Sequence, residues 1–208
     1  MSARPPLPSD IAGIRVPGDA VSAAVWTWAN RSLPTYLFNH SVRSYCWGAT
    51  IADREGWAFE PPILWAAALM HDFGLTRLSA NTMCFEVEGA EIARRLLEGW
   101  GMPFSAADRV AIAIILHMQP SVTLDDGVEA VLLDRATSID VRGDGYEEIE
   151  SLAAAVAARY PRGAFDRRFL AAVTREAAAR PACQSARLVH EKGLAAWMAR
   201  SPWSTNRH

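Results

Sequence analysis

The chain has 208 residues, half of them apolar, with 21 basic and 23 acidic side chains and a net charge of −2. This length predicts one sizeable core, and the scattered basic residues argue against a nucleic-acid-binding face. The apolar stretches are well short of the roughly 20 residues that span a bilayer. The N-terminus holds no apolar signal-peptide segment either, so we expect a cytoplasmic protein without a membrane partner.

The three cysteines are Cys46, Cys84 and Cys183, which are odd in number and widely separated. They show no CxxC spacing, so neither a disulfide framework nor a thiolate zinc site is indicated. We expect all three to be small, buried apolar side chains.

Residues 1–20 hold four prolines and two glycines without a helical period, and we expect an arm that is extended over the surface or disordered. From Val21 onward the apolar residues recur with a helical period, and no segment alternates as a strand does. Glycines and prolines such as Gly56 and Pro120 mark the breaks. We expect a first helix that ends near Leu33 and further helices over 35–55, 63–73, 86–99, 105–118, 127–140, 147–160, 165–179 and 184–199. The sequence thus predicts an all-α single domain of seven to nine helices over residues 21–208.

An adjacent histidine and aspartate, His71 and Asp72, stand inside the otherwise apolar run ILWAAALMHDFGL (63–75). Both side chains would have to be desolvated there, and burying an unpaired charge is costly. A divalent cation removes this cost, because neutral imidazole and ionised carboxylate are ligands that Zn²⁺ and Fe²⁺ prefer. The pair therefore indicates a metal-dependent enzyme.

Three further candidates, His40, His117 and Asp140, each lie on a predicted helix. An isolated histidine is ordinarily a satisfied core or surface residue. Helices can nevertheless bring ligands from distant segments together inside a bundle, where packing fixes their geometry. The set in this order is more specific than any one member.

His40, then His71-Asp72, then a distant aspartate resemble the H…HD…D signature of the HD-domain superfamily of helical, metal-dependent enzymes. The flanking segments resemble those of the cyanamide hydratase family within it, over about residues 33–200. These segments are LPTYLFNHSVRSYCWG (33–48), MHDFGLT (70–76), FEVEGAEIARRLL (85–97), AIAIILHM (111–118), ATSIDVRGDG (136–145) and YPRGAFDRRFLAAVTREAAARP (160–181).

The resemblance implies an HD-type catalytic domain over residues 21–208 that binds one metal ion, Zn²⁺ or alternatively Fe²⁺. The implied ligands are His40, His71, Asp72 and Asp140. Asp134 competes with Asp140 for the last place, but the family's final ligand is closely followed by a glycine, and Gly143 matches it. The implied reaction is hydration of a small nitrile: water activated by the ion adds to the nitrile carbon, and cyanamide gives urea.

Asp72, His117 and Arg43 are the expected catalytic side chains. One oxygen of Asp72 can accept a proton from water while the other binds metal. His117 is expected to polarise the substrate or relay a proton, although capping of its helix or binding of a second metal are alternatives. Arg43 lies three residues after His40 and is expected to hold the carboxylate of Asp72 or Asp140.

Glu86 and Thr137 complete the expected pocket, together with His117 as a substrate-binding residue. Glu86 is expected to orient His71 or His40, with a helix-start carboxylate as the alternative interpretation. Thr137 lies one helical turn before Asp140 and is expected to point toward the substrate.

Three other functions compete with nitrile hydration. A metal-dependent phosphohydrolase, acting on a nucleotide or other phosphate ester, would need cations for the phosphate charge, and between His40 and Asp140 we expect only Arg43 and Arg77 to reach the metal. A di-iron oxygenase would need an additional histidine pair, and a degenerate binding module would not keep every ligand. We expect a small-molecule substrate, and the Ala-rich last helices are compatible with a homodimer.

Overall fold

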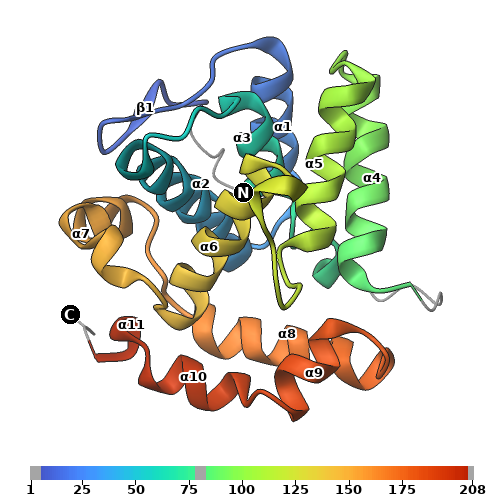
Figure 1. The fold of residues 1–208 in the computed structure, drawn as a ribbon, viewed down its shortest axis with the longest axis vertical. Helices are drawn as coiled ribbons and strands as arrows, with labels where there is room; N and C mark the ends of the chain where they lie inside the picture. Colours follow the sequence, from blue (N-terminus) through green and yellow to red (C-terminus); the bar gives the residue numbers. More distant parts are fainter. Residues whose placement is uncertain (1–5, 78–82, 206–208) are drawn as a thin grey trace.

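The computed structural model describes residues 6–77 and 83–205. In this part of the chain the structure is helical except for one short hairpin, which confirms the predicted all-α class (Figure 1). The elements in order are β1 (Asp10–Ile11), β2 (Ile14–Arg15), α1 (Ala20–Ser32), α2 (Thr35–Glu55), α3 (Pro61–Met70), η1 (Phe73–Thr76), α4 (Phe85–Gly99), α5 (Phe104–Leu116), η2 (Leu124–Asp126), α6 (Val128–Arg142), η3 (Tyr146–Glu148), α7 (Glu150–Arg159), α8 (Phe165–Ala179), α9 (Gln184–His190), α10 (Leu194–Arg200) and α11 (Pro202–Thr205).

Helix α3 forms the centre of the core. Its residues Ile63–Met70 are all buried, so the helix has no polar face, which is typical of a helix enclosed by others. It packs against α1, α2, α5 and α6. Prolines at its first turn start it without loss of a hydrogen bond, and it ends at His71, so the predicted His-Asp pair lies at the centre of the molecule.

The turn after α3 packs closely against α4. A Cβ atom on Gly74 would lie 2.1 Å from the backbone oxygen of Phe85, so only glycine fits there. Gly89 of α4 faces the same turn, with its Cβ position 3.4 Å from the backbone nitrogen of Gly74. The two glycines therefore let α4 lie directly against the segment that carries His71 and Asp72.

The C-terminal helices α8 to α10 run along one edge of the molecule, at the bottom of Figure 1. The single helix expected over 184–199 is divided into α9 and α10, because Gly193 adopts the left-handed conformation with φ +71°. A further short helix, α11, follows at Pro202, so the described residues form eleven α-helices where seven to nine were expected. Trp203 of α11 donates its indole N–H to the carbonyl of Ile139 at the end of α6.

Two expectations for the rest of the chain were wrong. Cys84 and Cys183 form a disulfide across 99 residues, and only Cys46 of the described cysteines is the buried free thiol that was expected of all three. No strand was expected, yet residues 10–15 pair as a two-residue hairpin that buries Ile11. None of the helices in the described ranges combines the length and apolar character needed to cross a membrane.

Candidate metal centre

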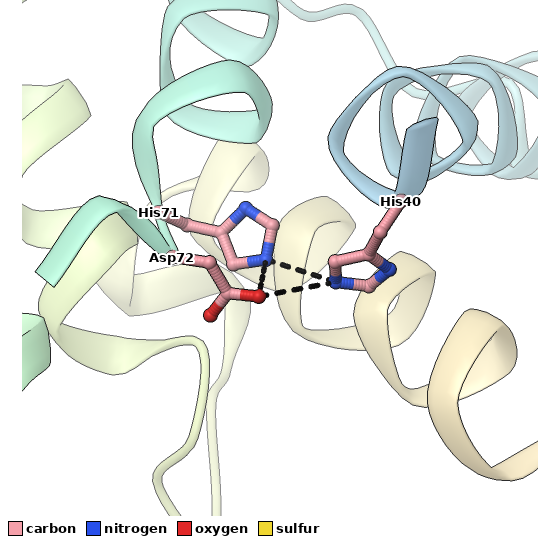
Figure 2. Close-up of side chains that lie close together, drawn as sticks. All are labelled: His40, His71 and Asp72. Carbon is pink, nitrogen blue, oxygen red and sulfur yellow. Dashed lines mark hydrogen bonds and ion pairs between the residues drawn. The ribbon is translucent and has the colours of Figure 1, made fainter. Parts of the chain in front are cut away.

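Three potential ligand atoms converge in the core, as Figure 2 shows. His40 comes from α2, and His71 and Asp72 follow α3. The Nε2 atoms of the two histidines are 3.1 Å apart, and Oδ2 of Asp72 lies 3.5 Å from Nε2 of His40 and 3.3 Å from Nε2 of His71. All three side chains are buried, so the structure brings together the first three predicted ligands.

Hydrogen bonds at the other ring nitrogens fix the histidine tautomers. Nδ1 of His40 donates to the Asp140 carboxylate at 2.7 Å, and Nδ1 of His71 donates to the carbonyl of Ala68 at 2.8 Å. Each Nε2 atom therefore presents a lone pair to the other and to Oδ2 of Asp72, which has no hydrogen-bond partner among the described residues. Acceptors that face one another in a buried site need a cation between them, so the donor set fits a divalent metal ion.

The pKa values of the two histidines shift in opposite directions. Burial lowers the pKa of His40 and favours its neutral form. Burial also acts to lower the pKa of His71, but the Asp72 carboxylate outweighs it and raises that pKa overall. A proton and a metal ion would therefore compete for Nε2 of His71.

His117 lies beside the cluster at the end of α5. Its Nε2 atom is 3.9 Å from Oδ1 of Asp72, and its ring centroid is 4.9 Å from that of His71. Its Nδ1 donates to the carbonyl of Ile114, and burial together with His71 lowers its pKa to about 4. His117 is therefore a neutral imidazole with a free lone pair, not the helix-capping imidazolium that was the alternative interpretation.

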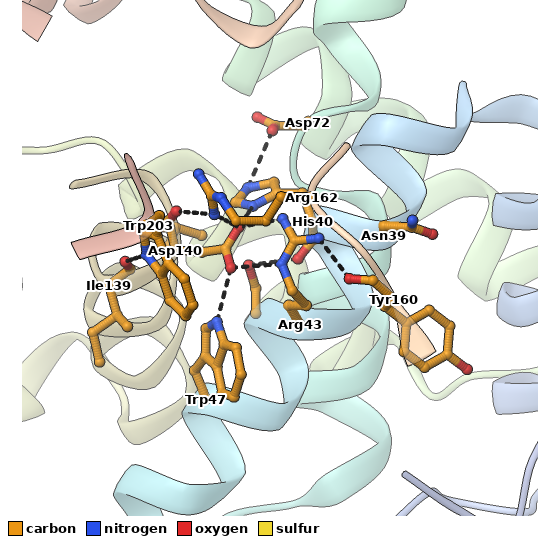
Figure 3. A network of polar contacts seen from close by, with 12 residues as sticks. Asn39, His40, Arg43, Trp47, Asp72, Ile139, Asp140, Tyr160, Arg162 and Trp203 are labelled. Carbon is orange, nitrogen blue, oxygen red and sulfur yellow. Dashed lines mark hydrogen bonds and ion pairs between the residues drawn. The ribbon is translucent and has the colours of Figure 1, made fainter. Parts of the chain in front are cut away.

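Asp140 lies behind His40 and not among the converging atoms (Figure 3). Its Oδ1 accepts from Nε of Arg43 at 2.8 Å and from the indole of Trp47 at 2.9 Å. Its Oδ2 accepts from Arg43 at 2.7 Å, from Nδ1 of His40, and from Arg162 at 3.3 Å. Both oxygens are thus fully engaged, and the geometry differs from the expectation that Asp140 is a direct ligand.

The electrostatics of Asp140 agree with this role behind the histidine. Burial alone would raise its pKa, but Arg43 and Arg162 hold the pKa well below its ordinary value. Arg43 is completely buried and contacts Asp140, one of the two carboxylates it was expected to hold, and not Asp72. A permanent carboxylate on Nδ1 of His40 fixes the ring and makes Nε2 a stronger donor to a metal.

Glu86 does not orient either histidine. Both Nδ1 atoms already donate to other acceptors, and Glu86 instead lies in a buried charged cluster with Glu176 and Arg180, where burial raises its pKa. The expectation that it positions His71 or His40 was wrong, because the described contacts of both Nδ1 atoms are with Asp140 and the carbonyl of Ala68. Thr137 does line the cavity described next, although its hydroxyl donates to the carbonyl of Asp134.

A cavity of about 360 Å³ opens from the cluster. His40, His71, Asp72 and His117 form one part of its lining, and α6 contributes Asp134, Thr137, Ser138, Val141 and Arg142. The residues around α9 and α10 contribute Gln184, Arg187, Leu188, Lys192, Leu194 and Trp197. Three cations therefore line the cavity, Arg142, Arg187 and Lys192. None of them was expected there, because all three lie after Asp140, the last expected ligand.

The chain matches the profile of the HD domain over residues 37–191. It therefore belongs to the HD domain family. No curated protein matches the chain. The buried His40, His71 and Asp72 cluster within this domain defines an enzyme of the metal-dependent HD class.

Proposed function

We propose that the protein is a metal-dependent phosphohydrolase that cleaves a small phosphate ester. His40, His71 and Asp72 would hold a divalent cation, with Zn²⁺ as the expected metal and Fe²⁺ as the alternative. The observation that carries the proposal is the presence of Arg142, Arg187 and Lys192 in the lining of the same cavity. Guanidinium and ammonium groups are the side chains that bind and stabilise phosphoryl charge.

The size of the cavity supports an ester larger than a simple nitrile. Its volume of about 360 Å³ lies in the range of roughly 300–1,000 Å³ that is ordinary for ligand pockets. Cyanamide would fill only a small part of this space. A phosphate ester with an organic group can contact both the ligand cluster and the wall formed by α9 and α10.

A divalent cation supplies Lewis-acid polarisation and activation of water at neutral pH. The residues of the chain supply the rest. Arg187 and Lys192 are exposed at the cavity and can hold the phosphate. Oδ1 of Asp72, 3.9 Å from Nε2 of His117, can accept a proton from the attacking water, and Nε2 of the neutral His117 can take up this proton and pass it to the leaving group. Asp140 keeps His40 in the orientation that the site requires.

The test is phosphate release from a panel of phosphate monoesters, including nucleoside monophosphates, by protein loaded with Zn²⁺, Mn²⁺, Co²⁺ or Fe²⁺. We expect Arg187→Gln and Lys192→Gln each to raise KM about tenfold, with bound metal unchanged. Arg95→Gln is the matched control, because Arg95 is 72% exposed and pairs with Glu91 outside the cavity. Absence of turnover with every metal and ester, or equal effects of the control and cavity variants, would refute the proposal.

Nitrile hydration is a second candidate, and the motifs shared with the cyanamide hydratase family favour it. One structural observation agrees. The ring of Phe169 lies 5.8 Å from that of His40 and lines the cavity, so part of the surroundings of the cluster is apolar and suits an uncharged substrate. Urea release from cyanamide, assayed with the same metal-loaded protein, separates this activity from phosphate release.

A cytoplasmic location remains a prediction from the sequence. The disulfide between Cys84 and Cys183 argues against it, because disulfides persist mainly in oxidising compartments. Localisation of the tagged protein in cell fractions tests this expectation directly.

A further inference from the structure

A short stretch of chain builds one whole wall of the cavity. The six residues that contribute are Gln184, Arg187, Leu188, Lys192, Leu194 and Trp197. Two of the three cavity cations belong to this stretch, which we call the cationic wall (residues 184–197). Its position relative to the ligand cluster therefore determines how an anion is held.

The cationic wall contains only short helices. Helix α9 has seven residues and packs on α8 and α10, and Gly193 interrupts the chain before α10. Isolated helices of this length are not stable in water. The wall therefore depends on its contacts with the rest of the molecule to stay in place.

The start of the wall is attached covalently to α4. Cys183 is the residue immediately before α9 and Cys84 the residue immediately before α4, and their sulfur atoms are bonded. In the residue directly after Cys183, the side-chain Nε2 of Gln184 donates a hydrogen bond to Oε1 of Gln119 at 3.1 Å. Gln119 lines the cavity two residues after His117, so this contact joins the wall to the segment that carries that histidine.

The junction also contains buried charges that keep α8 against α4. Arg180 pairs with Glu176 and lies 3.9 Å from Glu88 of α4, and Glu176 accepts a hydrogen bond from the backbone N–H of Phe85. These contacts do not include residues 184–197. Breaking the disulfide is therefore expected to loosen α9 while α8 stays in place.

We propose that Cys84 and Cys183 are positioning residues whose disulfide holds the cationic wall over the metal cluster, so that its reduction weakens anion binding without removing the metal. The anionic nature of the ligand rests on the proposed function. The disulfide takes no part in the chemistry of the cluster, because neither cysteine lines the cavity.

Reduction needs a two-electron donor, for which a small dithiol serves. Cys84 is less buried than Cys183. One thiolate of the dithiol therefore attacks Sγ of Cys84 and displaces the Cys183 thiolate, which takes up a proton. The second thiol of the reagent then attacks the mixed disulfide. It releases Cys84 as a thiol, and the reagent leaves as a cyclic disulfide.

The experiment compares three forms of the full chain: oxidised protein, protein reduced by dithiothreitol and then desalted without oxygen, and the Cys84→Ser/Cys183→Ser variant. Three quantities are measured on each form. These are Zn²⁺ stoichiometry, calorimetric affinity of the Zn²⁺-loaded protein for inorganic phosphate, and amide hydrogen exchange in residues 184–190. The doubly substituted variant treated with dithiothreitol is the control for other effects of the reagent.

We expect equal Zn²⁺ content in all forms, at least tenfold faster exchange in α9 once the disulfide is open, and at least tenfold weaker phosphate binding. Unchanged exchange in α9 in both the reduced and the substituted protein would overturn the inference, as would faster exchange with unchanged phosphate affinity. If α9 exchanges faster but phosphate binds to no form, the proposed function fails, and positioning of the wall by the disulfide is still supported.

Discussion

The Asp140→Asn substitution distinguishes between two roles of this carboxylate, positioning of His40 and direct binding of the metal. Asp140 is completely buried and accepts hydrogen bonds from Arg43, Trp47, Arg162 and His40. The amide would leave the buried Arg43 guanidinium without its counter-charge. Removing one partner of such a pair costs about 3–5 kcal/mol. Removing a carboxylate behind a ligand histidine typically lowers metal affinity by about 10–100-fold.

We therefore expect Asp140→Asn to lower the free energy of unfolding in urea by about 3–5 kcal/mol while the protein still binds one metal ion at higher concentration. Asp72→Asn is the matched control. It should abolish stoichiometric binding, because Asp72 supplies one of the three ligand atoms that converge in the core. Metal titration followed by calorimetry measures the affinities. Complete loss of binding in Asp140→Asn, with stability unchanged, would show that Asp140 is a ligand and refute our interpretation of its geometry.

Three further predictions concern the surroundings of the cluster. His117→Ala should keep the metal but lower kcat about 10²–10⁴-fold, and loss of metal in this variant would identify His117 as a ligand. Gly74→Ala should lower the free energy of unfolding in urea by about 1–3 kcal/mol, because its Cβ atom would lie 2.1 Å from the carbonyl oxygen of Phe85. Gly99→Ala is the control and should be close to neutral, because nothing lies within 4 Å of its Cβ position. Burial raises the pKa of Asp134 to about 6 from 3.8, so its contribution to stability is present at low pH and is lost as the pH rises from about 4 to about 6. Relative to the unsubstituted protein, the free energy of unfolding of Asp134→Asn should consequently rise by about 1–2 kcal/mol from pH 4 to pH 7. An equal difference between the two proteins at both pH values would contradict the raised pKa of Asp134.

The helices were predictable because their signals are local. Apolar periodicity with glycine and proline breaks placed most of the spans within a few residues of those observed, and the fully apolar run before His71 correctly predicted a buried helix. The largest error, one helix over 184–199 instead of two, came from Gly193, which adopts the left-handed conformation between α9 and α10. A glycine within a helical pattern does not by itself mark a break, so the periodicity alone predicted one helix.

The parts of the site that could not be predicted depend on contacts between distant residues. The sequence predicted that Arg43 contacts the carboxylate of either Asp72 or Asp140. The packing of α2 against α6 places Asp140 beside it. Arg187 and Lys192 lie beyond the last motif residue, so nothing in the sequence connects them with His40. The disulfide joins cysteines 99 residues apart in a set of three, for which spacing carries no information.

The burial of α3 on every side has a consequence for how the chain matures. A helix without a water-tolerant face has no stable position until its neighbours have assembled around it, and His71 and Asp72 sit at its end. Their partner His40 arrives on a different helix. A complete set of donor atoms therefore exists only in the folded molecule, so binding of a metal ion at these residues would require that folding is complete.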